Sequence, residues 1–257
     1  MSQAKERPIL FSGPMVLAIV AGRKTVTRRE IKPRMRSADT QFELHQQPDG
    51  SWRPLHTFDE SCMDAQGTEH PIVCPYGRTG DRLWVRETWL EDPEDDGTWA
   101  YTQHMGCKGS PLSDIPKRFQ KPEHCIFRAS WEGPDMLWRP SIHMPRWASR
   151  ILLEVTDVRV ERLQDINDEQ AQAEGMVYTD FGLQERPGRA SIDGGKTFHP
   201  LKPQQAPGWH AGDATHPDQC LDRARWAFAN LWEKINGENS WDANPWVWVV
   251  EFKRIEP

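Results

Sequence analysis

The sequence predicts an α+β fold in which a small, bent β-barrel is flanked by helices, and three observations lead to this prediction. Short segments rich in β-branched residues alternate apolar and polar positions at period two, as half-buried strands do. Two segments, around Met15 and around Phe228, instead carry apolar residues in helical patterns. In residues 150–163 the apolar parity changes midway, which indicates the kind of bulge by which small barrels close.

The N-terminal region is predicted to be a strand, a helix and a second strand. Residues 8–11 form a short apolar strand, and Pro14 then lies in the first turn of a helix that Gly22 closes. Residues 24–31 are a strand on which Thr25, Thr27 and Arg29 share one face. Lys24, at the turn into this strand, can lean over that face.

The middle of the chain alternates predicted strands with polar excursions. Strands are expected at 82–87 and 124–129. The stretches near 34–72, 91–122 and 178–217 lack a sustained period and are predicted to be irregular insertions into one domain spanning residues 1–257. The third stretch, rich in Gly and Pro, is predicted to be disordered or to act as a lid.

The C-terminal third carries the clearest periodic patterns. In 150–163, Ile151, Leu153 and Val155 have odd parity whereas Val158 and Val160 have even parity, so a bulge is expected near residues 156–157. A helix capped at 166–168 ends at Gly175, and a longer helix capped by Asp218 is predicted to run to residues 236–237. Residues 245–252 form a strand that is apolar on both faces and is covered by a helix.

Composition limits the class of protein. The chain has 257 residues and 13 tryptophans, enough for a sizeable core. No apolar run approaches the roughly 20 residues of a membrane span, so we expect no membrane and a cytoplasmic location. The sequence does not indicate an oligomeric partner.

The five cysteines predict neither a disulfide framework nor a cofactor site. They are odd in number and widely spaced, which favours reduced thiols. Cys62, His70 and Cys74 could meet a zinc ion with His124 or Cys125, but their spacing matches no standard ligand pattern. We therefore expect no metal and no cofactor.

Positive charge is concentrated in one window. From Arg23 to Arg36 there are seven basic residues and one acid, whereas the whole chain carries −6. An acidic chain with one basic block is suited to a local anionic or carbonyl-bearing ligand rather than to coating nucleic acid. The alternative is a solvated, basic strand edge.

Several segments resemble the ASCH-domain family, in the longer form common in phages and prophages. The segments are Pro8–Ser12, Gly22–Arg29, Gly80–Glu87, the helix from Ala171 to Gly175, Trp138–Arg150 and Trp248–Phe252. ASCH domains are PUA-like barrels, so the resemblance implies this architecture. It also implies that the cleft between the barrel and the first helix recognises RNA or a nucleobase.

Some small bacterial members share a Gly-Arg-Lys-Thr-x-Thr-x-Arg strand and hydrolyse the amide of N4-acetylcytidine. The resemblance implies that their catalytic lysine, threonine and glutamate correspond here to Lys24, Thr27 and Glu174, with Arg29 as the following arginine. Each residue has a simpler interpretation: a β-former for Thr27, a solvated turn residue for Lys24 and a surface charge for Glu174.

These residue types suit amide hydrolysis. Lys24, with its pKa lowered by desolvation and by neighbouring arginines, would activate the Thr27 hydroxyl as a nucleophile. Glu174 would orient the lysine or carry a proton to the leaving amine, and Arg29 or a backbone N–H would stabilise the oxyanion. Further substrate-binding residues are predicted at Arg28, Thr25, Arg86, His143, Arg146 and Trp147, although the last three are equally well explained by a packed tryptophan beside surface basic residues.

Three functions therefore remain open from the sequence. The first is an N4-acylcytidine amidohydrolase. The second is a binding module that holds RNA or a modified base without chemistry. The third is a metal-independent ribonuclease.

Overall fold

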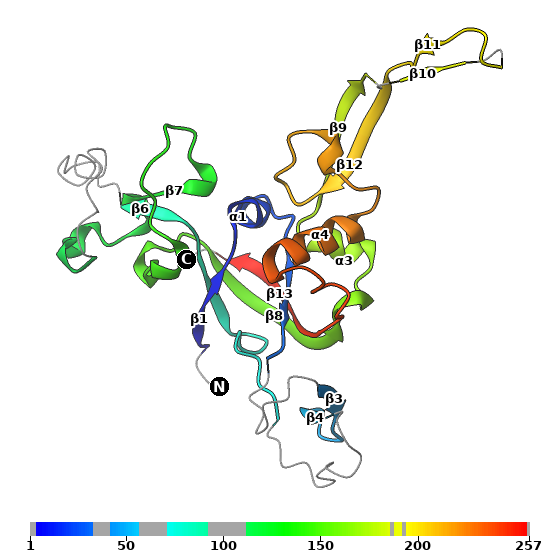
Figure 1. Cartoon of the computed structure of the whole chain (residues 1–257). Helices are drawn as coiled ribbons and strands as arrows, with labels where there is room; N and C mark the ends of the chain where they lie inside the picture. The colour runs from blue at the N-terminus through cyan, green and yellow to red at the C-terminus, as the bar shows by residue number, and fades with distance from the viewer. Residues whose placement is uncertain are drawn as a thin grey trace.

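The computed structural model describes residues 4–32, 42–56, 71–91, 112–185, 188–191 and 194–255. A central five-stranded sheet has the strand order β1-β5-β8-β13-β2 (Figure 1). β1 and β5 are parallel, and the other neighbours are antiparallel. The bounds are β1 Glu6–Leu10, β2 Val26–Glu30, β5 Arg82–Arg86, β8 Leu152–Arg162 and β13 Trp246–Ile255. Together with the helices described below, the sheet confirms the α+β class.

The sheet does not close into a barrel within the described residues. β1 and β2 are its two edge strands, and no backbone ladder joins them there. The side chain of Arg29 on β2 nevertheless donates a hydrogen bond to the carbonyl oxygen of Leu10 on β1. The two edges are therefore linked by a side chain rather than by paired strands.

The predicted bulge in β8 is confirmed. Asp157 pairs with Glu251 and Val155 pairs with Phe252, which leaves Thr156 as the extra residue. One unpaired residue reverses the side-chain parity of a strand. Consequently Val158 and Val160, beyond the bulge, pack against the same cluster that buries Val155.

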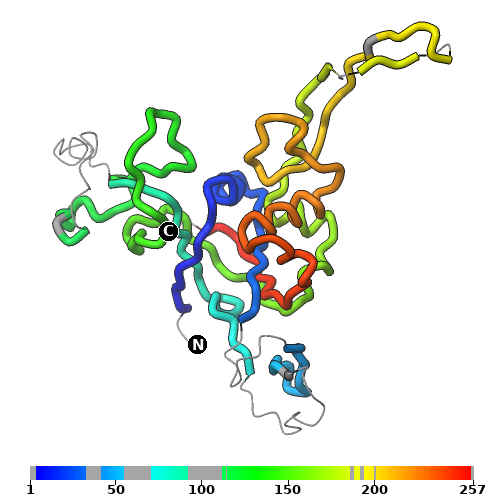
Figure 2. Tube along the Cα trace, in the orientation of Figure 1, coloured from blue at the N-terminus to red at the C-terminus, as the bar shows by residue number. Residues whose placement is uncertain are grey.

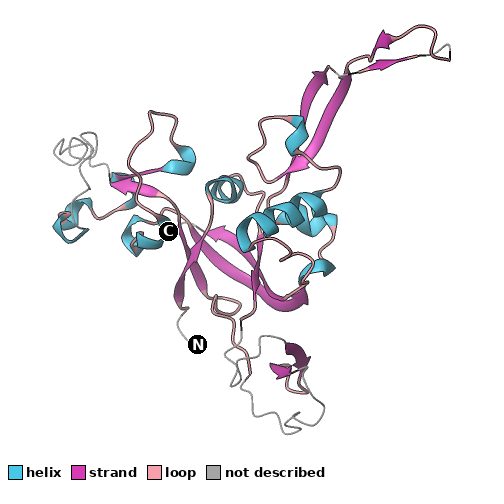
Figure 3. Ribbon diagram, in the orientation of Figure 1, coloured by secondary structure: helices cyan, strands magenta, loops and turns pink. Residues whose placement is uncertain are grey.

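Helices cover both faces of β13 (Figure 3). α1 (Gly13–Val20) buries Val16 and Ile19 in the cluster that contains Trp248 and Val250. α3 (Asp168–Ala173) and α4 (Ala224–Asn236) pack instead against Val247 and Val249. The prediction that residues 245–252 are apolar on both faces is confirmed, because successive residues of this strand enter different cores.

The predicted start of the last helix is wrong. Asp218 lies in a short 3-10 turn, Pro217–Gln219, and α4 begins only at Ala224. Leu221 remains extended because its backbone exchanges two hydrogen bonds with Trp209. The carboxylate of Asp168, from α3, accepts a hydrogen bond from the backbone N–H of Arg225 and so satisfies one of the free donors at the start of α4.

The predicted irregular insertions contain regular structure. β3 (Phe42–Gln46) and β4 (Trp52–His56) form a hairpin within the first, and most of its remaining residues lie outside the described ranges. In the second, residues 112–124 form 3-10 turns, and residues 92–111 lie outside the described ranges. The strand expected at 124–129 is shorter: β7 (Cys125–Phe127) pairs with β6 (Trp89–Glu91).

The third predicted insertion is a long two-stranded ribbon that projects from the body, which corrects the expectation of disorder (Figure 2). β9 (Val177–Gln184) pairs antiparallel with β12 (Gln204–His210), and β10 (Arg189–Ala190) pairs with β11 (His199–Pro200) towards the tip. Glycines at the tip and a bulge near Pro207 obscure the alternation in the sequence. No helix in the described ranges is long and apolar enough to cross a membrane.

Candidate functional site

The turn before β2 is hydrogen-bonded to the C-terminal ends of two helices, α1 and α3. The N–H groups of Arg23 and Lys24 both donate to the carbonyl of Ala18 in α1, and the N–H of Thr25 donates to the carbonyl of Ala173 in α3. Gly22, at φ +73°, makes the left-handed turn that a glycine adopts without strain. The side chain of Lys24 is thereby directed into the protein between α1 and α3.

Lys24 is buried, and all three of its ammonium donors have acceptors. Nζ lies 2.7 Å from Glu174 Oε2, 2.8 Å from the carbonyl oxygen of Glu174 and 2.8 Å from that of Val26. Gly175, at φ +102°, follows Glu174, and a Cβ there would lie 3.3 Å from Cβ of Lys24. A glycine at this position therefore allows the lysine and the end of α3 to approach closely.

Glu174 is shared between two cations. Its Oε1 accepts from Arg28 at 3.4 Å, and Arg28 also donates to Glu161 on β8 at 3.0 Å. The side chains of Lys24 and Arg28 have no exposed surface, and that of Glu174 is 2% exposed. The guanidinium of Arg28 is thus buried and holds Glu174 in place, and the prediction that Arg28 binds substrate stays a prediction.

The pKa of Lys24 is lowered from its ordinary value. The main cause is burial, which disfavours the ammonium, and the charges of Arg29 and Arg28 add to it. The carboxylate of Glu174 opposes the shift by stabilising the ammonium. Burial and the Glu174 carboxylate therefore act on the pKa of Lys24 in opposite directions, and the effect of burial is the larger.

An open hollow of about 400 Å³ adjoins this pair. Thr27 and Glu174 both line it, whereas Lys24 lies behind Glu174 and does not. The hydroxyl of Thr27 has no hydrogen-bond partner among the described residues, so it is available to a ligand. The other lining residues come from α1, β2 and α4: Met15, Arg28, Arg29, Glu30, Phe228, Leu231, Trp232, Ile235 and Asn236.

Arg29 and Phe11 form the side of the site next to β1. The guanidinium of Arg29 lies 5.3 Å from the ring centre of Phe11, and Lys24 Nζ lies 5.5 Å from the same centre. The negative face of an aromatic ring attracts both cations. Phe11 therefore holds two positive groups beside the hollow.

The structure brings together Lys24, Glu174, Thr27, Arg28 and Arg29, but not the other predicted ligand-binding residues. The exposed Thr25 does not line the hollow, and its backbone pairs with Ala173 and Phe252.

The remaining four predicted residues do not line the hollow. Arg86 donates to the carbonyl of Ile142, and His143 lies in a 3-10 turn. Arg146 forms an ion pair with Glu6, and Trp147 packs edge-on against Trp89, with ring centres 5.5 Å apart. The simpler interpretation, a packed tryptophan beside surface basic residues, fits Arg146 and Trp147 best.

Sequence reasoning missed the wall that α4 contributes. The helical pattern of Phe228, Leu231, Trp232 and Ile235 in the sequence is typical of a core-facing helix, yet all four line the hollow and Ile235 is 54% exposed. The indole Nε1 of Trp232 is buried and has no partner among the described residues. The sequence carries no signal that distinguishes this wall from core.

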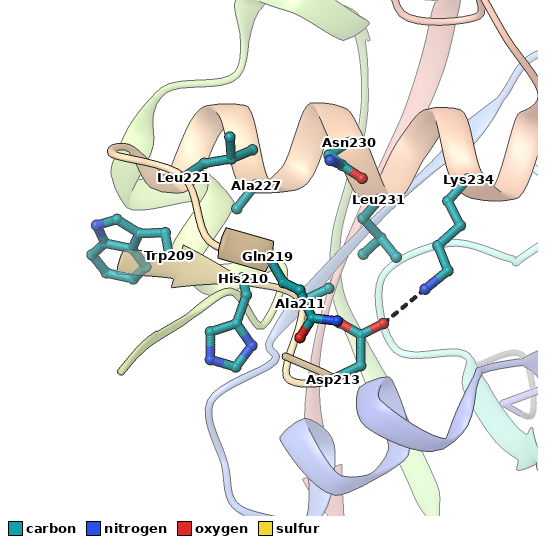
Figure 4. Close-up of a pocket in the computed structure, with 10 residues that line it drawn as sticks. All are labelled: Trp209, His210, Ala211, Asp213, Gln219, Leu221, Ala227, Asn230, Leu231 and Lys234. Atoms are coloured by element: carbon teal, nitrogen blue, oxygen red, sulfur yellow. Dashed lines mark hydrogen bonds and ion pairs between the residues drawn. The ribbon is translucent and has the colours of Figure 1, made fainter. Parts of the chain in front are cut away.

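A second hollow, of about 320 Å³, lies at the foot of the ribbon (Figure 4). It is bounded by β12 and α4, and its floor includes an ion pair of 2.8 Å between Asp213 and Lys234. Nδ1 of His210 accepts hydrogen bonds from the N–H groups of Gly212 and Ala214, and Nε2 lies 2.9 Å from Oγ1 of Thr179. This pattern requires the neutral ring. Burial lowers the pKa of His210, with Arg23 in the same direction and Asp213 opposed.

Comparisons with known proteins do not assign the chain: no family model, curated protein or solved structure matches it. Within the described residues, no group of three or more His, Cys, Asp or Glu side chains could hold a metal ion.

Because Lys24 and Glu174 form a buried ion pair, substitutions at these two positions should destabilise the protein strongly, and their effects should not be additive. Lys24→Met and Glu174→Gln should each lower the free energy of unfolding by roughly 3–5 kcal/mol, because each leaves buried polar groups unpaired. The double variant should lose clearly less than the sum, since the two side chains interact directly. Urea unfolding of the four proteins measures this cycle.

The matched control is the exposed pair Lys32–Glu30, at 2.9 Å near the end of the same strand. Lys32→Met and Glu30→Gln should each change stability by less than about 1 kcal/mol. Equal losses at the two pairs would contradict the account of the buried one.

Because His210 is neutral in the folded protein, the stability of the segment at the foot of the ribbon should depend on pH. Because the folded pKa of His210 lies below the unfolded value of 6.5, its contribution to stability is complete above pH 6.5. That contribution should fall as pH drops from 6.5 to the folded pKa, by at most about 1.4 kcal/mol per pH unit. After correction for the intrinsic pH dependence of amide exchange, the protection factors of the N–H groups of Gly212 and Ala214 should fall over the same range. A His210→Asn variant should lack this loss of protection, and pH-independent protection factors in the native protein would contradict the assignment.

Proposed function

We propose that this chain is an ASCH-type protein of PUA-like architecture and that it hydrolyses an acyl amide on a cytosine base bound in the hollow beside β2. The supporting observation is the buried Lys24–Glu174 pair, 2.7 Å apart, whose carboxylate side opens onto the same hollow as the free hydroxyl of Thr27. Glu174 lies 150 residues from Lys24 in the sequence, and the fold brings it beside Lys24 and to the same hollow as Thr27.

In the proposed reaction, Thr27 Oγ1 attacks the acyl carbonyl carbon while its proton passes to the Lys24–Glu174 pair. Burial lowers the pKa of Lys24 and so favours its neutral amine, which is the group within this pair that accepts the proton. As the tetrahedral intermediate collapses, the carbon–nitrogen bond breaks and the pair returns the proton to the leaving exocyclic amine. Water then hydrolyses the acyl ester on Thr27, which regenerates the hydroxyl and releases the carboxylic acid.

The surrounding residues suit the same substrate. Arg29 provides positive charge beside Thr27, where the oxyanion would develop. Met15, Phe228 and Trp232 supply an apolar wall against which a flat base can pack, and the unpartnered Nε1 of Trp232 is a donor within that wall. Arg28 also lines the hollow, and its ion pair with Glu174 keeps that carboxylate in position.

A binding module without chemistry is the second candidate. It is favoured by the three acceptors around Lys24, since a lysine whose donors are all paired also suits a purely structural role. In that case the hollow would hold a modified base and release it unchanged.

Incubation with N4-acetylcytidine and a panel of acylated cytidines, followed by chromatography of released cytidine, tests the proposal. Thr27→Val should lower kcat at least about a thousandfold, as removal of a nucleophile does, whereas Thr27→Ser should retain activity. Thr25→Val is the matched control, because Thr25 lies two residues away but does not line the hollow. No turnover by the wild type across the panel, with binding retained, would favour the binding module. Turnover unaffected by Thr27→Val would exclude the proposed nucleophile.

A further inference from the structure

We infer that the ribbon of β9 and β12 is an arm that binds the sugar–phosphate backbone of a single-stranded nucleic acid, so that the base in the hollow is part of a polymer. The placement of the base rests on the proposed function. The arm itself is argued from its position, its charge and its exposed aromatic residues.

Both ends of the ribbon lead to the walls of the hollow. β9 begins at Val177, three residues after Glu174, so the carboxylate and the ribbon belong to one continuous segment. On the return side, β12 ends at His210. An isolated β-bridge between Trp209 and Leu221 then holds the segment before α4 against the end of β12. Leu231 on α4 lines both the hollow beside Glu174 and the one at the foot of the ribbon. A strand that follows the ribbon therefore arrives beside Glu174.

The outer half of the ribbon is positively charged in an acidic protein. Arg189, Lys196 and Lys202 are exposed, and the described residues of 188–203 include no carboxylate. With Arg186 and Asp193, which lie in the two short gaps, the sequence of 186–203 carries +3. Because the net charge of the whole chain is −6, the residues outside 186–203 carry −9. This charge favours an anionic partner at the outer half of the ribbon, and the window from Arg23 to Arg36 is a second positive part of the sequence.

Exposed aromatic rings accompany these cations. Tyr178 near the foot and Phe198 near the tip are 55% and 56% exposed. Tyr178 is supported from one side by Trp209, with ring centres 5.2 Å apart. Phe198 lies between Lys196 and Lys202 in the sequence, and cations beside an exposed ring are the combination by which proteins bind single strands, through phosphate contacts and base stacking. This combination favours a nucleic acid over an acidic protein.

The strands between the cations and the hollow act as a spacer. Eight residues at about 3.4 Å each give β9 a length of about 27 Å, and neither β9 nor β12 contains a lysine or an arginine, so phosphate contacts are expected at the outer half of the ribbon alone. The arm therefore predicts that an acylated cytosine within an oligomer binds more tightly than the free nucleoside, and that the difference disappears at high salt.

The test uses fluorescence anisotropy with labelled 12-nucleotide RNA and DNA oligomers of one sequence, and with polyglutamate as an acidic polymer. The variant Arg189→Glu/Lys202→Glu should bind the preferred oligomer at least about tenfold more weakly at low salt. The slope of log K against log salt should be less steep by about 1.4, for two lost phosphate contacts at about 0.7 each. Lys117→Glu/Arg118→Glu is the control, since it reverses two exposed charges on a 3-10 turn outside the ribbon and should bind as the wild type does.

Turnover of free N4-acetylcytidine by the same variants separates this inference from the proposed function. Unchanged nucleoside turnover with weakened oligomer binding supports the arm, and the tighter of the RNA and DNA oligomers identifies the natural polymer. Ribbon-dependent oligomer binding without any nucleoside turnover would still support the arm while removing the hydrolase proposal. Equal oligomer binding by the ribbon variant and the control, or binding of polyglutamate as tight as that of the oligomers, would overturn the arm.

Discussion

The burial of one ammonium group constrains the centre of this structure. An unpaired buried charge is too costly to persist, so Lys24 requires acceptors on every side. The fold supplies two backbone carbonyls and the carboxylate of Glu174, which requires α1, the turn at Gly22, β2 and the end of α3 to meet at one point. Arg28 and Glu161 extend this arrangement to β8. The position of the hollow follows from these contacts.

The same interaction separates two roles among the basic residues in and just before β2. The side chains of Lys24 and Arg28 have no exposed surface and bond Glu174. Arg29 is only partly buried, and it also links β2 to β1 through Leu10. Basic residues that are close neighbours in the sequence therefore have different roles in the structure. Lys24 and Arg28 are buried and hold Glu174, whereas Arg29 is partly accessible. The open edge between β1 and β2 lies where this division occurs, beside Phe11.

The features predictable from the sequence are those set by local patterns. The bulge at Thr156 followed from a change of parity, the cap at Asn167 from its side chain, and the two-faced burial of β13 from its continuous apolar run. The start of α4 was wrong because the pairing of Leu221 with Trp209 and the cap from Asp168 are contacts between distant segments. For the same reason the meeting of Lys24 with Glu174 could be expected only from a family resemblance, and the wall of α4 was not anticipated.

The state of the Lys24 side chain is the most direct measure of this account. Its 13Cε chemical shift, assigned by comparison with Lys24→Met, can be followed by NMR as pH is raised. The account predicts that this signal titrates below the signals of the exposed lysines, because burial lowers the pKa, and that it moves further down in Glu174→Gln, where the opposing carboxylate is lost. A signal that titrates together with the exposed lysines and ignores the substitution at residue 174 would contradict the buried, coupled pair.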